Sequence, residues 1–295
     1  MKKEINHHKY VFIFLFLVSY LVETRAMIQV PSFSDVATNT IFKEFQETDH
    51  LTIRTNLDSL LLNKKKGTYQ KAQLIAVAGD SEKINLSIKI KSRGKSRRNM
   101  CELPPLKLNF NKTDLANLGL HQAFDKLKLI THCQLDGEME DLLLKEYWTY
   151  RFYNQLSENS FRVKLLKITY LHELDSNRKI DSYAVVIENT NEMAHRIGGT
   201  TVNQYGVTSS QLVKNDYHNL LVFNYMIGNT DWDLRFQQNI KFVKIKGQDQ
   251  LIPVPYDFDQ AKLVDAPYLT VDNNIRIRKA DNRFLLIGKK LLHTV

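Results

Sequence analysis

The feature that most constrains the fold is a strict alternation of apolar and polar residues at 83–91. Ile84, Leu86, Ile88 and Ile90 fall on one side of an extended chain, and the residues between them are polar. A period of two predicts a β-strand with one buried face. Further strand candidates follow at 106–110, 125–131, 161–171 and 182–188. Several such strands in one region indicate a β-rich lobe.

One long helix is expected within this region, at 138–156. Leu144, Trp148, Phe152 and Leu156 recur at intervals of four residues and would form one apolar stripe along the helix. We expect these strands and this helix to form the N-terminal part of the fold.

A polar segment at 188–192 separates this region from the rest of the chain. After it, residues 208–211 fit a capping box, and the helix that follows is expected to stop at Gly228. With 295 residues the chain can form one large domain or two lobes. We expect an α+β fold with a β-rich N-terminal lobe at about 27–188 and a more helical C-terminal lobe at about 189–295.

Residues 1–26 have the features of a signal peptide. Three lysines precede an apolar run at 10–22, and Thr24-Arg25-Ala26 suits cleavage after Ala26. The apolar run is short for a membrane span. The alternative is a retained N-terminal anchor, which would hold the protein at a membrane. We therefore expect an exported protein, in the periplasm, at the cell surface or outside the cell.

The chain has two cysteines, Cys101 and Cys133. An even count in an oxidising compartment favours a disulfide, and neither cysteine has the spacing of a zinc site. A Cys–His enzyme built on Cys133 and the preceding His132 is the alternative, but no third member of a triad can be identified. We expect Cys101 and Cys133 to be bonded.

The formal net charge of +9 suits an anionic partner such as a polyphosphate, an anionic lipid or a nucleic acid. No Arg/Lys-rich array with interleaved aromatic residues is present, which argues against a nucleic-acid partner. A basic polymer-binding protein stays open, and it would bind in a salt-sensitive way with no effect of nucleotide.

The segment 228–259 carries the residues with the clearest chemical meaning. Asp231 lies in a loop, Asn239 precedes a strand candidate, and Asp257 follows it. Phosphoryl transfer uses one carboxylate to orient the acceptor hydroxyl, and an Asn with a second carboxylate to hold magnesium. The alternative is two acidic turns around a hairpin, because Asp and Asn are ordinary turn residues.

Basic residues upstream could serve the phosphates. The loop 92–98 is basic and contains Gly94 and hydroxyl groups, so it could cover phosphates, or it could be a solvated hairpin tip. Lys107 lies on the polar face of a strand candidate, and Glu146 flanks the apolar stripe of the helix. These two could form the Lys–Glu pair that holds phosphates in kinases, or both could face solvent.

Taken in chain order, these elements resemble the CotH kinase family, the spore-coat-protein-H-like atypical protein kinases, over about residues 51–264. The matching elements are Arg93-Gly94-x-Ser96, Lys107, Glu146, Gly228-Asn229-x-Asp231-Trp232, Asn239 and Pro255-Tyr256-Asp257-Phe258-Asp259. The resemblance implies a two-lobed kinase-like fold that binds ATP and Mg²⁺ and phosphorylates protein hydroxyls.

The resemblance also implies roles at the matching positions. Lys107 would contact the phosphates and Glu146 would orient it, with Arg93 and Ser96 in the covering loop. Asp231 would be the catalytic Asp, with Asp233 as the alternative. The implied metal ligands are Asn239, Asp257 and Asp259.

The function expected from the sequence is therefore an exported kinase. It would transfer the ATP γ-phosphate to a Ser or Thr hydroxyl of a protein substrate with the help of Mg²⁺. The alternative is a catalytically inactive relative that binds nucleotide or acts as a cell-envelope scaffold.

Overall fold

The computed structural model describes residues 39–79, 81–94, 97–131, 133, 138–267, 269, 285–287 and 290–292. The expected signal peptide and Ser96 lie outside the described residues.

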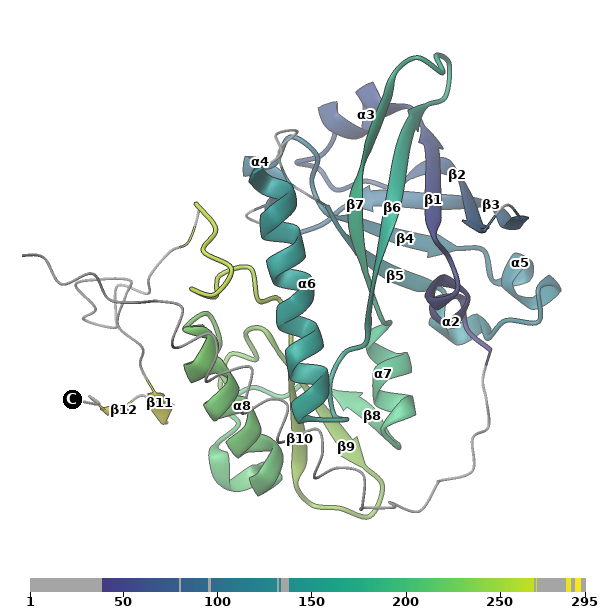
Figure 1. Ribbon diagram of the computed structural model, residues 1–295. Coiled ribbons are helices and arrows are strands. Elements are labelled where there is room, and N and C mark those ends of the chain that lie inside the picture. The colour runs from purple at the N-terminus through teal and green to yellow at the C-terminus, as the bar shows by residue number, and fades with distance from the viewer. Residues whose placement is uncertain are drawn as a thin grey trace, which may run out of the picture. The chain divides into compact units, whose positions relative to one another are not determined.

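Seven strands close into a β-barrel with the order β1-β2-β3-β4-β5-β7-β6. They are β1 (His50–Thr55), β2 (Gln70–Ala78), β3 (Ser81–Ser92), β4 (Leu106–Phe110), β5 (Lys126–Ile130), β6 (Val163–His172) and β7 (Lys179–Ile187). Each neighbouring pair is antiparallel except β1 and β6, which run parallel. In Figure 1 β6 and β7 cross in front of β3, β4 and β5.

The barrel interior is filled by the apolar side of each alternating strand. Ile53, Leu74, Ile90, Leu108 and Leu129 come from five different strands and are all fully buried. Removing this much apolar surface from water supplies the main driving force for folding. Closure also leaves no strand edge of the barrel unpaired.

A smaller layer follows the barrel in the chain. The sheet β10-β9-β8 consists of β8 (Gly199–Val202), β9 (Ile240–Ile245) and β10 (Leu251–Pro255). Helix α7 (Thr190–Arg196) contacts β8, and α8 (Lys214–Ile227) contacts β10. The long helix α6 (Glu138–Leu156) packs on β6, β7 and α8, so it joins the barrel to this layer (Figure 1).

An aromatic cluster forms the second core under α6. The rings of Tyr153 and Phe223 lie 4.8 Å apart, and Tyr150 and Phe258 are also 4.8 Å apart. Phe258 therefore anchors the segment after β10 against α6. This contact also helps to position the carboxylates on either side of it, Asp257 and Asp259.

The remaining elements are short. They are α2 (Ile41–Gln46), α3 (Leu57–Leu62), α4 (Arg97–Met100), α5 (Lys112–Asn117), η2 (Gln122–Phe124), η3 (Ser209–Gln211), β11 (Leu285–Ile287) and β12 (Lys290–Leu292).

The expectation of a two-lobed, kinase-like α+β fold is wrong. The strand candidates do not form an open sheet of one lobe, because β1 pairs with both β2 and β6 and thereby closes a seven-stranded mixed barrel. Hydrophobic alternation specifies where strands lie and which face is buried, but it does not specify which strands pair.

The individual elements agree better with the sequence. Strands β3 to β7 correspond to the five predicted strands, with shifted ends, and α6 begins and ends as expected. Gly228 ends α8 in the left-handed conformation, with φ of 63°. The capping box at Thr208 and Gln211 is present, but it starts η3, and α8 begins only at Lys214.

The expected disulfide is confirmed. Cys101 and Cys133 are bonded, with their Cα atoms 4.4 Å apart. The N–H of Leu103 donates to the carbonyl of Cys133 over 3.1 Å, so backbone pairing supports the bridge. The bond is consistent with an exported or otherwise oxidising location. None of the helices in the described part of the chain is long and apolar enough to span a membrane.

We predict that replacing both cysteines with serine lowers the free energy of unfolding by about 3–4 kcal/mol, because the bridge closes a loop between positions 32 residues apart. Denaturant unfolding of the wild-type and double-variant proteins without reductant measures this. The exposed Ser81→Ala variant is the control, and equal midpoints for all three proteins would contradict the prediction.

Candidate functional site

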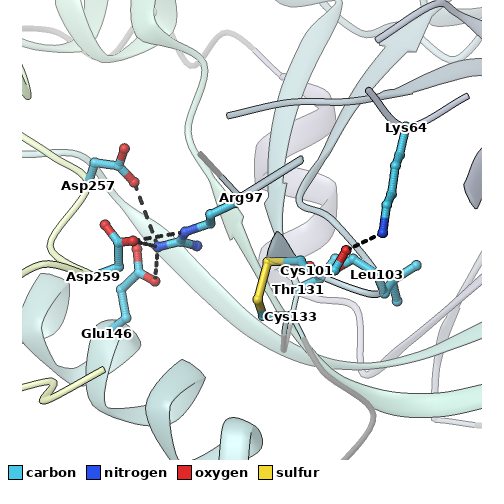
Figure 2. Close-up of a disulfide and its surroundings, with 9 residues drawn as sticks. All are labelled: Lys64, Arg97, Cys101, Leu103, Thr131, Cys133, Glu146, Asp257 and Asp259. Atoms are coloured by element: carbon cyan, nitrogen blue, oxygen red, sulfur yellow. Dashed lines mark hydrogen bonds and ion pairs between the residues drawn. A yellow bond between two sulfur atoms is a disulfide. The ribbon is translucent and has the colours of Figure 1, made fainter. Parts of the chain in front are cut away.

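A buried arginine gathers three acidic side chains at the junction of the barrel and α6. Arg97 Nη2 lies 3.0 Å from Glu146 Oε2 and 2.8 Å from Asp259 Oδ2, and it lies 4.0 Å from Asp257 Oδ1. Its Nε also donates to Asp259 Oδ2 over 3.0 Å. Figure 2 shows the three carboxylates converging on the guanidinium group. Arg97 lies on α4, Glu146 lies on α6, and Asp257 and Asp259 follow β10. The cluster therefore connects three segments that are far apart in the sequence.

Glu146 has an unusual environment for a carboxylate. It is 3% exposed, and its Oε1 is buried without a hydrogen-bond partner among the described residues. Burial raises the pKa of Glu146 to about 7; Arg97 opposes this shift, and the charges of Asp259 and Asp257 add to it. Burial likewise raises the pKa of Asp259, again against the effect of Arg97.

Asp257 is the member of the cluster that reaches solvent. Its side chain is 35% exposed, and 4.0 Å separates it from the arginine. Its backbone is held in the left-handed region at φ of 65°, and its N–H donates to the Tyr150 hydroxyl over 2.8 Å. A strained backbone conformation held in place by its neighbours is common at functional sites. The carboxylate of Asp257 is therefore both fixed in position and accessible.

Asp231 is held close by, in the loop after α8. Its N–H donates to Asn229 Oδ1 over 3.0 Å, and its Oδ1 accepts a hydrogen bond from Gln238. Asn239 Nδ2 donates to Asp231 Oδ2 over 2.8 Å. Burial, followed by the negative charge of Asp259, raises the pKa of Asp231. Asp231 is thus a base whose proton affinity is higher than that of an exposed aspartate.

Of the two polar atoms of the Asn239 amide, only Nδ2 hydrogen-bonds to the described residues. Its Nδ2 is used by the side chain and the carbonyl of Asp231, at 2.8 and 2.7 Å. Its backbone is left-handed, with φ of 51°, and its carbonyl accepts from the N–H of Tyr256 over 3.0 Å. This leaves the amide oxygen Oδ1 as the atom that could contact a hard cation.

Asp233 has a different part in the loop. Its Oδ1 accepts from the N–H groups of Arg235 and Phe236, and its Oδ2 pairs with Arg235 at 3.1 Å. Burial alone would raise the pKa of Asp233, but the bonds from Arg235 and Phe236 outweigh it and lower the pKa. Asp233 therefore has a structural role, because it stabilises the turn that contains Arg235 and Phe236.

A row of lysines crosses the outer face of the barrel toward the carboxylates. Lys107 on β4 is paired in register with Lys91 on β3 and with Lys128 on β5. Burial, followed by the positive charge of Lys91, lowers the pKa of Lys107. We call Lys91, Lys107 and Lys128 the lysine row.

Lys128 is the member of the row nearest the carboxylates. Its ammonium group lies 4.6 Å from the ring centroid of Tyr256, and Lys241 lies 5.4 Å from the same ring. Burial, followed by the charge of Arg93, lowers the pKa of Lys128 to about 7, while Asp257 opposes this shift. The charges of Lys107 and Asp257 both act on the pKa of Lys128, so Lys128 lies within electrostatic range of both.

The ion pair expected between Lys107 and Glu146 is not formed. Among the described residues Glu146 pairs with Arg97, and no ion pair of Lys107 is found. Lys107 lies among other cations on the outer face of the barrel, whereas Glu146 lies in the buried cluster on α6. The two residues thus have different surroundings. Asp231 and Asn239 are hydrogen-bonded, and the charges of Asp259 and Asp257 act on the pKa of Asp231.

Sequence reasoning missed Arg97 and Lys128. Arg97 is one cation in a loop that contains several, and nothing in the sequence distinguishes the buried one. Lys128 could have been found, because it occupies an outward position in the strand candidate at 125–131, as Lys107 does in its own strand. Arg93 is half-buried and anchored by its N–H, which donates to the carbonyl of Pro105 over 2.8 Å.

A magnesium ion bound with a nucleotide fits the oxygen atoms of this site only in part. Within the described ranges no group of three or more His, Cys, Asp or Glu residues could hold a metal by itself. Nucleotide-bound Mg²⁺ needs only one or two protein oxygens besides phosphate and water. Asp257 and the amide oxygen of Asn239 could supply them, whereas Asp259 is already neutralised by Arg97.

Comparison with protein-family models and with characterised proteins finds no match for this chain.

We predict that the stability of the wild-type protein falls, relative to a Glu146→Gln variant, as the pH rises from about 4.5 to about 7. The folded-state pKa of Glu146 is raised from 4.5 to about 7, so the folded state binds the proton more tightly than the unfolded state in this window. Thermal unfolding across this pH range measures the difference.

Asp141→Asn is the matched control, because Asp141 is an exposed carboxylate on the same helix. Its stability difference from wild type should stay nearly constant between these pH values. A Glu146→Gln difference that is equally constant would contradict the assigned environment of Glu146.

Proposed function

We propose that this chain binds ATP with Mg²⁺ beside the lysine row and transfers the γ-phosphate to a hydroxyl group of a protein substrate. The observation that best supports this proposal is that the positively charged lysine row lies near a carboxylate. The lysine row ends at Lys128, which lies within electrostatic reach of the exposed carboxylate of Asp257. A triphosphate with a bound cation needs this combination, since its phosphates require positive charge and its metal requires oxygen ligands.

The lysines would hold the phosphates. Lys107 and Lys128 are adjacent across β4 and β5, and burial lowers the pKa of each. A bound phosphate group would favour their charged forms and restore their pKa values. The ammonium groups of Lys128 and Lys241 both lie over the ring of Tyr256, which would stabilise them at the end of the row.

Asp231 would act as the general base. Its raised pKa brings its proton affinity closer to that required near neutral pH, which improves transfer of a proton from an acceptor hydroxyl. Gln238 and Asn239 donate one hydrogen bond to each of its oxygens, and a carboxylate has lone pairs left to accept another.

Asp257 and Asn239 Oδ1 would contact Mg²⁺, which neutralises charge on the transferred phosphoryl group. Arg97 would act as a positioning residue, because it is held by Glu146 and Asp259 and lies next to Asp257. These roles agree with the resemblance to CotH kinases in chemistry, although the fold implied by that resemblance is not found.

A second candidate is a nucleotide-binding scaffold without transfer activity. The observation that favours it is the ion pair of Asp259 with Arg97, at 2.8 Å, which removes one of the three expected metal ligands. For both candidates we propose that the mature chain is exported after removal of residues 1–26, and the disulfide supports an oxidising location.

We predict that ATP with Mg²⁺ raises the thermal stability of the wild-type protein, by about 2.7 kcal/mol at a ligand concentration of about 100 times Kd. Asp257→Asn should remove the Mg²⁺-dependent part of this gain, since it deletes the charge while Asn still tolerates the left-handed backbone. Thermal unfolding with ATP, with and without Mg²⁺, measures both effects.

Asp249→Asn is the control, because Asp249 is exposed in the turn between β9 and β10, and it should behave as wild type. A wild-type protein that gains no stability from ATP and Mg²⁺ would remove both candidate functions.

We predict that Asp231→Asn keeps the stabilisation by ATP and Mg²⁺ but lowers the rate of phosphate transfer about a hundredfold or more, because only the chemical step loses its base. Transfer of labelled phosphate to an acceptor protein measures the rate. Asp233→Asn is the comparison, and it should lower stability while largely keeping the transfer rate. The opposite pattern would assign the base to Asp233, and no transfer by the wild type would favour the scaffold.

A further inference from the structure

The outer face of strands β1 to β5 carries a second basic feature, a groove of about 870 Å³. Five cationic residues line it, and we call it the basic groove. The cationic residues that line it are Arg54, Lys71, Lys89, Lys112 and Lys126. None of the lysine row lines it, but Lys126, which does, also acts on the pKa of Lys107, so the groove lies beside the proposed nucleotide site.

Strand pairing aligns the centre of the basic groove. Lys71 is opposite Lys89, Lys89 is opposite Asn109, and Asn109 is opposite Lys126. Neighbouring strands lie about 4.8 Å apart, so these four side chains span about 14 Å in a line across the sheet. The groove therefore presents an extended row of positive charge and not a single anion site.

The positive charge of the groove is not balanced within it. Two acidic residues, Asp125 and Glu173, line the groove together with the five cations. Lys126 pairs with Asp125 at 2.8 Å, whereas the other four cations have no ion pair with any described residue. Like charges directly opposite each other on a sheet, such as Lys71 and Lys89, are destabilising. An anionic ligand would relieve this repulsion.

We propose that the basic groove binds an acidic segment of a partner protein, in which several Asp or Glu side chains lie along an extended chain. The carboxylates would contact the lysines, which are flexible point charges and tolerate varied spacing. Asn109 and Gln73 also line the groove, and their amides can both donate to and accept from a peptide backbone.

A peptide fits the groove better than a nucleic acid does. Binding of single strands relies on exposed aromatic rings on which bases stack. Phe110, which lines the groove, is 2% exposed and packs in the barrel core. Tyr69, which does not line the groove, is exposed, but Lys91 lies over its ring at 4.6 Å. Main-chain pairing of the peptide with a barrel strand is also excluded, because the closed barrel offers no free edge. Recognition must therefore come from side chains.

The test measures binding of a fluorescein-labelled peptide of alternating Glu and Gly to the full chain, by fluorescence anisotropy without nucleotide. The wild-type protein should bind this peptide, and a peptide with Gln in place of Glu should bind much more weakly. The Lys71→Glu/Lys89→Glu variant should weaken binding about tenfold or more, because attraction becomes repulsion. Added salt should weaken wild-type binding.

The matched control is Lys83→Glu/Lys246→Glu, which makes the same charge change at two exposed lysines outside the groove. It should lose much less affinity than the groove variant. A milder variant, Lys71→Gln/Lys89→Gln, guards against misfolding of the reversed one and should weaken binding to an intermediate degree.

Three outcomes would overturn the proposal. They are no binding of the Glu peptide by the wild type, equal loss of affinity in the groove and control variants, and tighter binding of a sulfated polysaccharide or a single-stranded oligonucleotide of equal charge. Because nucleotide is absent throughout, the result is independent of phosphate transfer.

Discussion

The arrangement of the site depends on one buried arginine. Arg97 forms ion pairs with both Glu146 and Asp259 and lies 4.0 Å from Asp257, although these residues come from three segments far apart in the sequence. Two carboxylates buried this closely would repel each other without a cation between them. Removing one partner from a buried ion pair leaves an uncompensated charge, at a cost of about 3–5 kcal/mol. The contact therefore joins the barrel, α6 and the segment after β10 as well as shaping the site.

The surface chemistry follows from how charge is distributed over the barrel. The interior positions of β3, β4 and β5 are apolar, so every charged residue of these strands must face outward. Strand pairing then places Lys91, Lys107 and Lys128 side by side in one row. In the next row Lys71 lies opposite Lys89, and Asn109 separates Lys89 from Lys126. The first row ends at the carboxylates, and the second lies in the basic groove.

The prediction of a two-lobed fold is wrong because the strands close into a barrel. Alternation located β3 to β7, because a period of two depends only on residues near in sequence. The parallel pairing of β1 with β6 joins residues more than a hundred positions apart, such as His50 and Lys167, and no local pattern encodes it. The five predicted strands also lacked β1 and β2, which complete the barrel.

By itself, the sequence determined the positions of β3 to β7, the extent of α6, the end of α8 at Gly228 and the pairing of the two cysteines, but not β1 and β2. Each rests on local periodicity, on the backbone freedom of glycine, or on a choice between only two thiols. Tertiary structure alone decided that Glu146 pairs with Arg97 and not with Lys107, and that Asp231 faces the carboxylates while Asp233 shapes its turn. These contacts depend on burial and on distances between remote segments, which residue type and spacing do not specify.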